Sequence, residues 1–252
     1  MSDVTVERDE GHLATVEIHR PPANYFDAAL IGELADVYER LDDDPDCRAI
    51  VLCSEGKHFC AGANLGSPGS PADEPRSLYR QALRLFASAT PVVAAVQGAA
   101  VGGGLGLALS ADFRVASPSS RFSANFARLG FHHGFALSVT LPALAGQQTA
   151  LDLLLTGRRV RGEEALALGL CDRLAEDDGI RERARALAAE VALSAPLAVR
   201  SIRATLRAGL LERVEHALER EASEQDRLRA SDDFREGVAA SMERRPPRFQ
   251  GS

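Results

Sequence analysis

The sequence predicts an α/β protein that is built on a parallel sheet and continues into a helical C-terminal part. Over the first half, short apolar runs alternate with segments of helical spacing, which is typical of this class. Two runs, Ala49–Cys53 and Val92–Val96, are apolar throughout, as strands buried on both faces of a parallel sheet are. After about residue 135 the strand signals fade. We expect an α/β core over residues 1–195 and a helical region over residues 196–252.

The N-terminal elements follow from alternation, prolines and helical spacing. Residues that alternate between the two faces of a strand over positions 4–18 predict a β-hairpin with its turn at Glu10-Gly11. Residues 20–24 predict a loop, because two prolines there interrupt both strands and helices. Ala28–Asp42 carries leucine and valine at helical spacing and predicts the first helix.

The rest of the chain is predicted to contain turns, one more strand and a series of helices. Residues 54–63 and 66–75 predict turn-rich connections, and Phe113–Ala116 predicts a third strand. The remaining helices are expected at 78–86, 105–110, 136–145, 148–155, 162–168, 179–193, 197–229 with a break at Gly209, and 232–243.

Charge and composition narrow the range of partners. The 252 residues include 29 Lys and Arg against 36 Asp and Glu, which gives a formal net charge of −7. Proteins that bind nucleic acid display basic patches, so we expect no nucleic-acid partner. The hydrophobic fraction of 45% and the charged fraction of 26% are ordinary for a globular protein, which argues against disorder and coiled coil.

The cysteines and the apolar stretches favour a cytoplasmic protein. The four cysteines form no C-x-x-C pair, which favours a reduced compartment over a zinc or redox motif. The first ten residues contain no apolar segment of a secretory signal. The uncharged stretch between Arg84 and Asp112 contains Pro91 and five glycines, so it predicts a buried strand, turn and helix rather than a membrane span.

Two small-residue turns follow two of the apolar strands. The first covers His58–Leu65, and the second carries glycines at 98, 102, 103, 104 and 106. These glycines do not fit the G-x-G-x-x-G fingerprint, which argues against a nucleotide-binding domain. They allow either close packing of a helix on the sheet or backbone N–H groups aimed at a developing oxyanion. Ligands of α/β sheets bind at such carboxyl ends of strands, so both turns are candidate site elements.

Five ordered blocks of this sequence resemble the crotonase superfamily, also called the enoyl-CoA hydratase/isomerase family. The two turns supply the first two blocks, and the resemblance extends from about Val4 to Phe249. The blocks are Phe59–Leu65 (F-x-A-G-A-D-L in the family), Val96–Gly104 (V-x-G-x-A-x-G-G-G), Ala111–Ala116 (C-D-x-R-I-A), Thr156–Leu170 (from T-G to G-L), and Asp233–Gly237 with Arg245–Phe249 in the tail.

The resemblance implies a crotonase-like fold, with a ββα spiral core and a C-terminal helical region that mediates trimerisation. It implies an acyl-CoA substrate and no cofactor apart from the coenzyme A of that substrate. It also implies a homotrimer or a homohexamer made of two trimers.

By the same resemblance, the N–H groups of Ala63 and Gly103 bind the thioester oxygen and stabilise an enolate. Negative charge grows on that oxygen when a proton leaves, or a nucleophile adds, next to the thioester. Losing one such donor typically costs ~2.7–4 kcal/mol of barrier height. Further substrate contacts along the CoA path are implied for Ala23, Tyr25, Phe26, Ala61 and Leu65.

At two positions the sequence departs from the hydratases of the family. Those enzymes carry two glutamates, and the matching positions here are Gly106 and Phe126. General acid–base catalysis typically contributes 10²–10⁴-fold, so without these carboxylates we expect a poor hydratase of simple enoyl-CoAs. Gly106 and Phe126 are expected to border the substrate instead.

His132 and His133 are the candidate proton-transfer groups, because imidazole titrates near neutral pH and other branches of the family place acid/base residues on this loop. The alternative is a hydrogen-bonded or solvent-facing pair. No third ligand lies at helical spacing, so we expect no metal. Asn64 replaces the usual aspartate of the substrate turn and is interpreted as structural, and Asn125 is a further polar candidate beside the substrate.

Two functions stay open. The first is an acyl-CoA enzyme of lyase or isomerase type that stabilises an enolate and is not a standard two-glutamate hydratase. The alternative is a catalytically degenerate acyl-CoA binding protein. The missing glutamates favour the alternative, whereas the retained turns and the histidine pair favour the enzyme.

Overall fold

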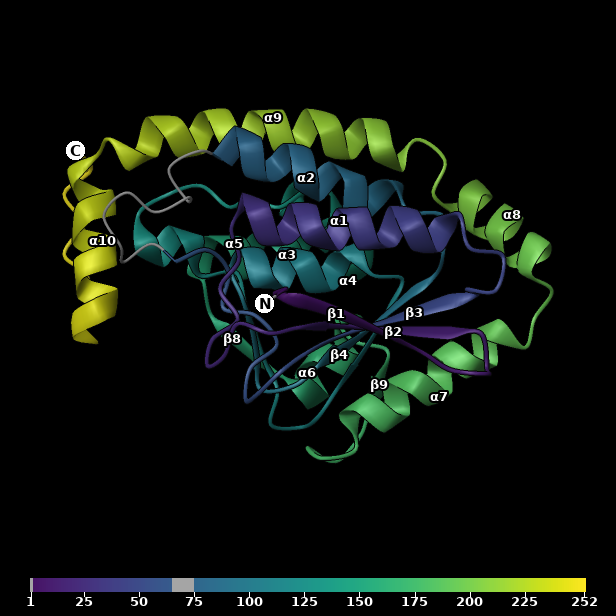
Figure 1. Cartoon of the computed structure of the whole chain (residues 1–252). Coiled ribbons are helices and arrows are strands. Elements are labelled where there is room, and N and C mark those ends of the chain that lie inside the picture. Colours follow the sequence, from purple (N-terminus) through teal and green to yellow (C-terminus); the bar gives the residue numbers. More distant parts are fainter. Residues whose placement is uncertain (1, 65–74) are drawn as a thin grey trace.

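The computed structural model describes residues 2–64 and 75–252, and in this part of the chain strands form two sheets (Figure 1). The larger sheet has six strands in the order β1-β2-β3-β4-β6-β9. Only β1 and β2 pair antiparallel, and the other neighbours are parallel. Its strands are β1 (Val4–Arg8), β2 (Leu13–Ile18), β3 (Ala49–Ser54), β4 (Val92–Val96), β6 (Phe113–Ala116) and β9 (Arg173–Leu174).

Helices cover both faces of this sheet, which explains why its central strands are apolar throughout. Ile50 and Leu52 of β3 point into a core with α1 (Ala28–Asp42) and α2 (Pro75–Ala87). The residue between them, Val51, points to the other face and packs with α7 (Ile180–Ala192). Figure 1 shows α1 and α2 on one side of the sheet and α7 on the other.

The smaller sheet lies beside the glycine-rich turn and was not predicted. Its strands are β5 (Ala99–Val101), β7 (Arg121–Ser123) and β8 (Arg159–Arg161), in the order β5-β7-β8. The expectation that strands end near residue 135 is wrong, because β8 and β9 follow it. Segments of two or three residues are too short for the two-residue repeat to stand out, and two of the three residues in β8 are exposed arginines.

The remaining predicted helices agree with the structure within three residues at each end. Pro75 begins α2 rather than ending a loop, as proline can at the first helical position. The rest of the predicted loop over 66–75 lies outside the described residues. The helices after the glycine-rich turn are α3 (Gly103–Ser110), the 3₁₀-helix η2 (Asn125–Leu129), α4 (Leu137–Ala145), α5 (Gln147–Thr156) and α6 (Gly162–Ala167).

The C-terminal helices return over the first half of the chain. The predicted break at Gly209 is confirmed, since this residue has a φ of 69° and separates α8 (Pro196–Leu206) from α9 (Leu210–Arg229). In Figure 1, α9 runs along α2, and α10 (Asp232–Glu243) turns away at its end to pack on η2. The division of the chain at residue 195 stays a prediction. None of the described helices has the length and apolar character to cross a membrane.

Candidate active site

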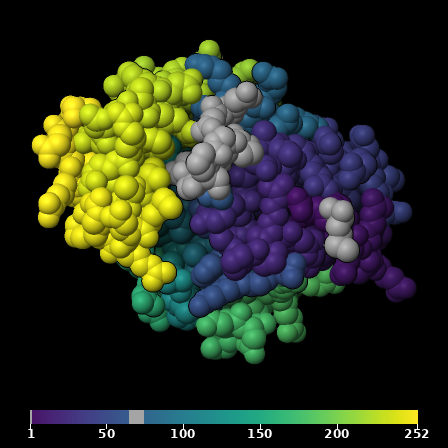
Figure 2. Space-filling view, turned by 60° about the vertical axis from the view of Figure 1, so that its left-hand side comes forward, coloured from purple at the N-terminus to yellow at the C-terminus, as the bar shows by residue number. Residues whose placement is uncertain are grey.

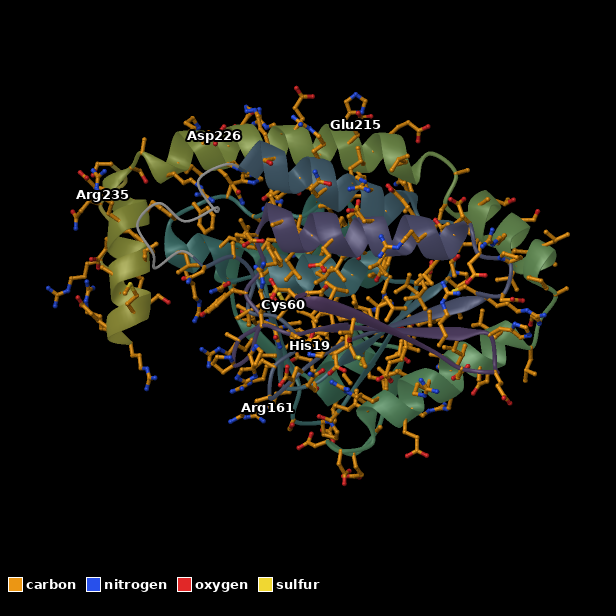
Figure 3. All side chains as sticks on the ribbon, in the orientation of Figure 1. His19, Cys60, Arg161, Glu215, Asp226 and Arg235 are labelled. Carbon is orange, nitrogen blue, oxygen red and sulfur yellow. The ribbon has the colours of Figure 1, made fainter. Side chains whose placement is uncertain are left out.

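Hydrogen bonds bring the two small-residue turns together. The turn after β3 pairs with β5, because Cys60 N donates to Ala99 O at 3.0 Å and Val101 N donates to Cys60 O at 3.0 Å. The same turn contacts the segment before α1, where Phe26 N donates to Gly62 O at 3.0 Å. Figure 3 labels Cys60 between the helices and the sheet, so this contact lies in the interior of the molecule.

Glycine is required where the two turns touch. A Cβ on Gly104 would lie 2.1 Å from Cys60 O, and a Cβ on Gly62 would lie 2.9 Å from Val101 O. The Gly62 position is also 3.2 Å from Gly103 N, so the first turn passes next to the start of α3. The close-packing interpretation of the glycine run is therefore confirmed.

Ala63 and Gly103 both line the pocket at this junction. Gly103 is the first residue of α3, so its N–H has no acceptor within the helix. Across the described residues, neither amide donates a hydrogen bond to another group of the protein. Both residues are partly exposed and line the pocket, so their N–H groups can donate hydrogen bonds to a ligand oxygen.

The pocket itself has a volume of about 520 Å³ and is mostly apolar. Four phenylalanines line it, and polar groups come from Asn64, Asn125, Gln225, Ser241 and the Arg229 cation. Its lining residues come from the two turns, β5, η2, α2, α9 and α10, from the segment before α1, and from the segment between η2 and α4. Figure 2 shows that the C-terminal helices, in yellow, pack against the rest of the molecule. Of the described residues, no carboxylate and no histidine lines the pocket, and no three metal-ligating side chains lie together.

The structure brings most of the predicted site residues together and leaves some aside. Ala23 does not line the pocket, but its carbonyl accepts from Ala61 N at 2.9 Å and so supports the first turn. Gly106 packs on Phe135 behind the pocket surface. Leu65 lies outside the described residues. The predicted residues that do line the pocket are Tyr25, Phe26, Ala61, Ala63, Asn64, Gly103, Asn125 and Phe126.

The two histidines lie near the pocket but do not line it. Their rings stack with centroids 4.1 Å apart, and His132 Nδ1 is 2.8 Å from His133 O. His133 Nε2 is 2.8 Å from Ser138 Oγ. Burial, with the neighbouring His132, lowers the pKa of His133 to about 4, so this ring is neutral at neutral pH. These contacts fit the hydrogen-bonded alternative, and the acid/base role stays a prediction.

Sequence reasoning missed Glu221 and Gln225, which face inward from α9. Glu221 is fully buried and accepts from Ala136 N at 2.8 Å, Ser138 N at 3.0 Å and Ser138 Oγ at 2.6 Å. Burial raises its pKa to about 7, against the opposing effect of these three donors. Gln225 receives a hydrogen bond from Tyr79 Oη at 3.0 Å and donates to His132 O at 2.9 Å.

A signal for these two residues exists in the sequence. Val214, Leu218 and Ala222 mark the buried stripe of α9, and positions 221 and 225 fall on the same stripe. A charged or amide side chain on an apolar stripe is buried only when it has hydrogen-bond partners. Figure 3 shows the contrast with Glu215 and Asp226, which lie on the outer side of α9.

We expect Glu221 to make stability depend on pH. Its pKa rises from 4.5 in the unfolded chain to about 7 in the folded one. The stability it contributes is therefore present below about pH 4.5 and is lost as pH rises through 7. Relative to Glu221→Gln, the wild-type free energy of unfolding should fall by roughly 3 kcal/mol between pH 4.5 and 8. Urea unfolding at both pH values measures this, and a difference that is constant with pH would contradict it.

The structure leaves no room for a side chain at position 106. A Cβ there would lie 2.5 Å from the Cβ of Phe135 and 2.8 Å from Phe135 O. We expect Gly106→Ala to destabilise the protein by about 1–3 kcal/mol through overpacking. Gly32→Ala in α1 is the matched control, because its Cβ would meet nothing closer than 3.6 Å. Urea unfolding should separate the two variants, and equal stabilities would contradict the packing argument.

A layered α/β protein whose two small-residue turns meet at an apolar pocket belongs to the class that binds a ligand beside the carboxyl ends of its strands. The family model described as enoyl-CoA hydratase/isomerase matches residues 8–252, and the chain belongs to this family, the crotonase superfamily. It is thus an acyl-CoA enzyme of that family, and its mixed α/β fold matches the crotonase-like expectation.

Individual relatives cover the chain almost completely. It is 33% identical to the (E)-benzylidenesuccinyl-CoA hydratase of Thauera aromatica, over 96% of this chain and 96% of the relative. It is 32% identical to the carnitinyl-CoA dehydratase of Proteus mirabilis (strain HI4320), with the same coverage of both chains. The crystal structure of an enoyl-CoA hydratase/isomerase from Pseudoalteromonas atlantica T6c matches with a TM-score of 0.88 and 34% identity, over 99% of this chain and 100% of that one.

Proposed function

We propose that this enzyme stabilises an enolate of an acyl-CoA thioester with the N–H groups of Ala63 and Gly103. The observation that carries the proposal is the pair of unpaired amides in one pocket. An apolar, water-poor pocket strengthens such hydrogen bonds, because little solvent competes for the oxygen. The helix dipole of α3 adds partial positive charge at Gly103.

We further propose that the reaction is not standard two-glutamate hydration. Gly106 and Phe126 stand where the family's hydratases carry carboxylates, and the described pocket lining contains no Asp or Glu. Water addition needs a base to take a proton from water. The names of the relatives from Thauera and Proteus support a thioester substrate for this chain and leave its acyl group open.

Three side chains are candidates for the proton-transfer step: His132 and His133 as the groups that carry the proton, and Asn125 as a group that positions the substrate or a water. The side chain of Asn125 lines the pocket, and within the described residues it makes no hydrogen bond, so it can position a substrate oxygen or a water. His132 and His133 stay the candidates from the sequence. If one is the base, its replacement by Ala should lower kcat by about 10²–10⁴ with little change in acyl-CoA affinity. Full activity of the double variant would leave Asn125 as the next residue to replace.

A catalytically degenerate acyl-CoA binding protein is the second candidate function. It is favoured by the same lack of a carboxylate or a histidine in the described pocket lining. Calorimetry with short, medium and aromatic acyl-CoAs, followed by turnover assays on those that bind, separates the two functions. Binding without turnover supports the degenerate protein, and absence of binding to every acyl-CoA would overturn both.

Assembly, location and cofactor use remain proposals. We propose a homotrimer or homohexamer, supported by the exposed apolar side chains of Leu197, Ile202 and Leu206 in α8. Light scattering on the purified protein measures the assembly, and a monomer would contradict the proposal. We also propose a cytoplasmic enzyme without membrane partners or cofactors other than the coenzyme A of its substrate.

A further inference from the structure

The segment of residues 131–138 holds two consecutive residues in a strained backbone conformation. Phe135 has a φ of 60° and Ala136 a φ of 58°, and both carry side chains. Residues other than glycine adopt this left-handed region at an energetic cost, so surrounding contacts must hold them there.

Two side chains of α9 supply those contacts. Glu221 accepts from the backbone N–H groups of Ala136 and Ser138, immediately after the strained Phe135. On the other side of Phe135, Gln225 donates a hydrogen bond to the carbonyl of His132. Residues 221 and 225 are four apart on one helix, so they lie on the same face. Together they form hydrogen bonds to both ends of the segment. We call Glu221 and Gln225 the α9 pair.

Phe135 lies within the backbone segment that the α9 pair holds. Its ring is buried, lines the pocket and packs against Gly106. Its centroid lies 5.3 Å from that of Phe26. Phe26 in turn reaches within 2.4 Å of where a Cβ on Gly103 would be. The Phe135 ring therefore lies next to the Phe26 ring, which reaches the start of α3.

We propose that Phe135 limits the length of the acyl group and that the α9 pair sets this limit by fixing the Phe135 ring in the pocket. The proposal rests on the proposed acyl-CoA function and adds a substrate class, compact apolar acyl groups, to it. Glu221 and Gln225 act through Phe135 and are positioning residues. A larger residue at position 106 of α3 could not fill the space of the Phe135 ring in its place, because Gly106 has no room for a Cβ.

Binding of butyryl-CoA, hexanoyl-CoA and decanoyl-CoA measures the limit directly. In Phe135→Ala, the affinity for decanoyl-CoA relative to butyryl-CoA should rise tenfold or more, since each newly buried methylene contributes about fourfold. Glu221→Ala should shift the same ratio in the same direction, and Glu221→Gln, which keeps one acceptor oxygen, should shift it less. The double variant Phe135→Ala/Glu221→Ala should shift it no further than Phe135→Ala, because both changes act on one ring. Glu215→Gln, on the exposed side of α9, is the matched control and should leave the ratio unchanged.

Amide hydrogen exchange tests the α9 pair without any ligand. In Glu221→Ala, the amides of Ala136 and Ser138 should exchange about tenfold faster or more, whereas Glu215→Gln should exchange as the wild type does. If the wild type binds no acyl-CoA, the proposed function fails, and the exchange experiment still decides whether Glu221 holds the segment. Faster exchange with an unchanged chain-length ratio would make Glu221 merely structural and overturn the proposal. Unchanged exchange in Glu221→Ala would overturn it as well.

Discussion

Replacing Gly103 by proline should lower turnover by about 10²–10³-fold on any acyl-CoA that the enzyme converts. Proline has no N–H, so the variant removes one of the two proposed oxyanion donors. It does so at the first residue of α3, a position where proline is compatible with a helix. The loss should fall on kcat rather than on KM, because the donor matters most when charge has moved onto the oxygen.

Gly103→Ala is the control for the steric part of this change. Any Cβ at position 103 would lie 2.4 Å from the Phe26 ring, so both variants share this clash, and proline alone adds ring carbons on the nitrogen. Only the proline variant lacks the N–H. Steady-state kinetics of the two variants, with circular dichroism to verify folding, isolate the contribution of the donor. Equal kcat values in the two variants would argue that the Gly103 amide does not bind the oxygen.

Hydration of crotonyl-CoA should be slower by about 10²–10⁴ than in a hydratase that carries both carboxylates. The reason is the chemical character of the pocket. Gly106 and Phe126 supply no proton acceptor, and four phenylalanines surround the space where water would have to be activated. Loss of absorbance of the enoyl thioester measures the rate at equal concentrations of this protein and a two-carboxylate relative.

The control for this comparison is binding. Crotonyl-CoA should bind with an affinity within reach of calorimetry, because binding needs the CoA contacts and the amides but no base. A kcat of about 10 s⁻¹ or more, a typical enzymatic value, would mean that another group replaces the carboxylates. His132, His133 and Asn125 would then be the side chains to replace next.

Elements with many repeats of a pattern were predictable from the sequence. Ala28–Asp42 repeats its apolar positions over four turns, and the structure begins and ends α1 at those residues. The strands β4 and β6 also match, because their residues are buried or nearly so. By contrast, β5 and β7 have three residues each, and their pairing depends on contacts with the turn at Cys60 and with β8. Such pairing is a long-range property that local patterns do not carry.

The candidate site divides in the same way. Ala63 and Gly103 were predicted because their turns follow predicted strands and resemble a family, and both residues line the pocket. Glu221 was missed because its role depends on a backbone segment that lies 83 to 85 residues earlier in the chain. The strain at Phe135 was also beyond sequence reasoning, since phenylalanine gives no local sign of a positive φ. The features that could not be predicted are those that form when segments distant in the sequence come together in the fold.

The C-terminal side of the pocket has a consequence for the order of events during synthesis. Gln225, Val238, Ser241 and Met242 complete the lining, although the two amides come from the first half of the chain. Chains fold as they leave the ribosome, N-terminal parts first. The sheet and the two turns can therefore form while the pocket still lacks one side, until residue 242 has emerged. A chain that has not yet reached residue 242 therefore cannot enclose a thioester in this pocket.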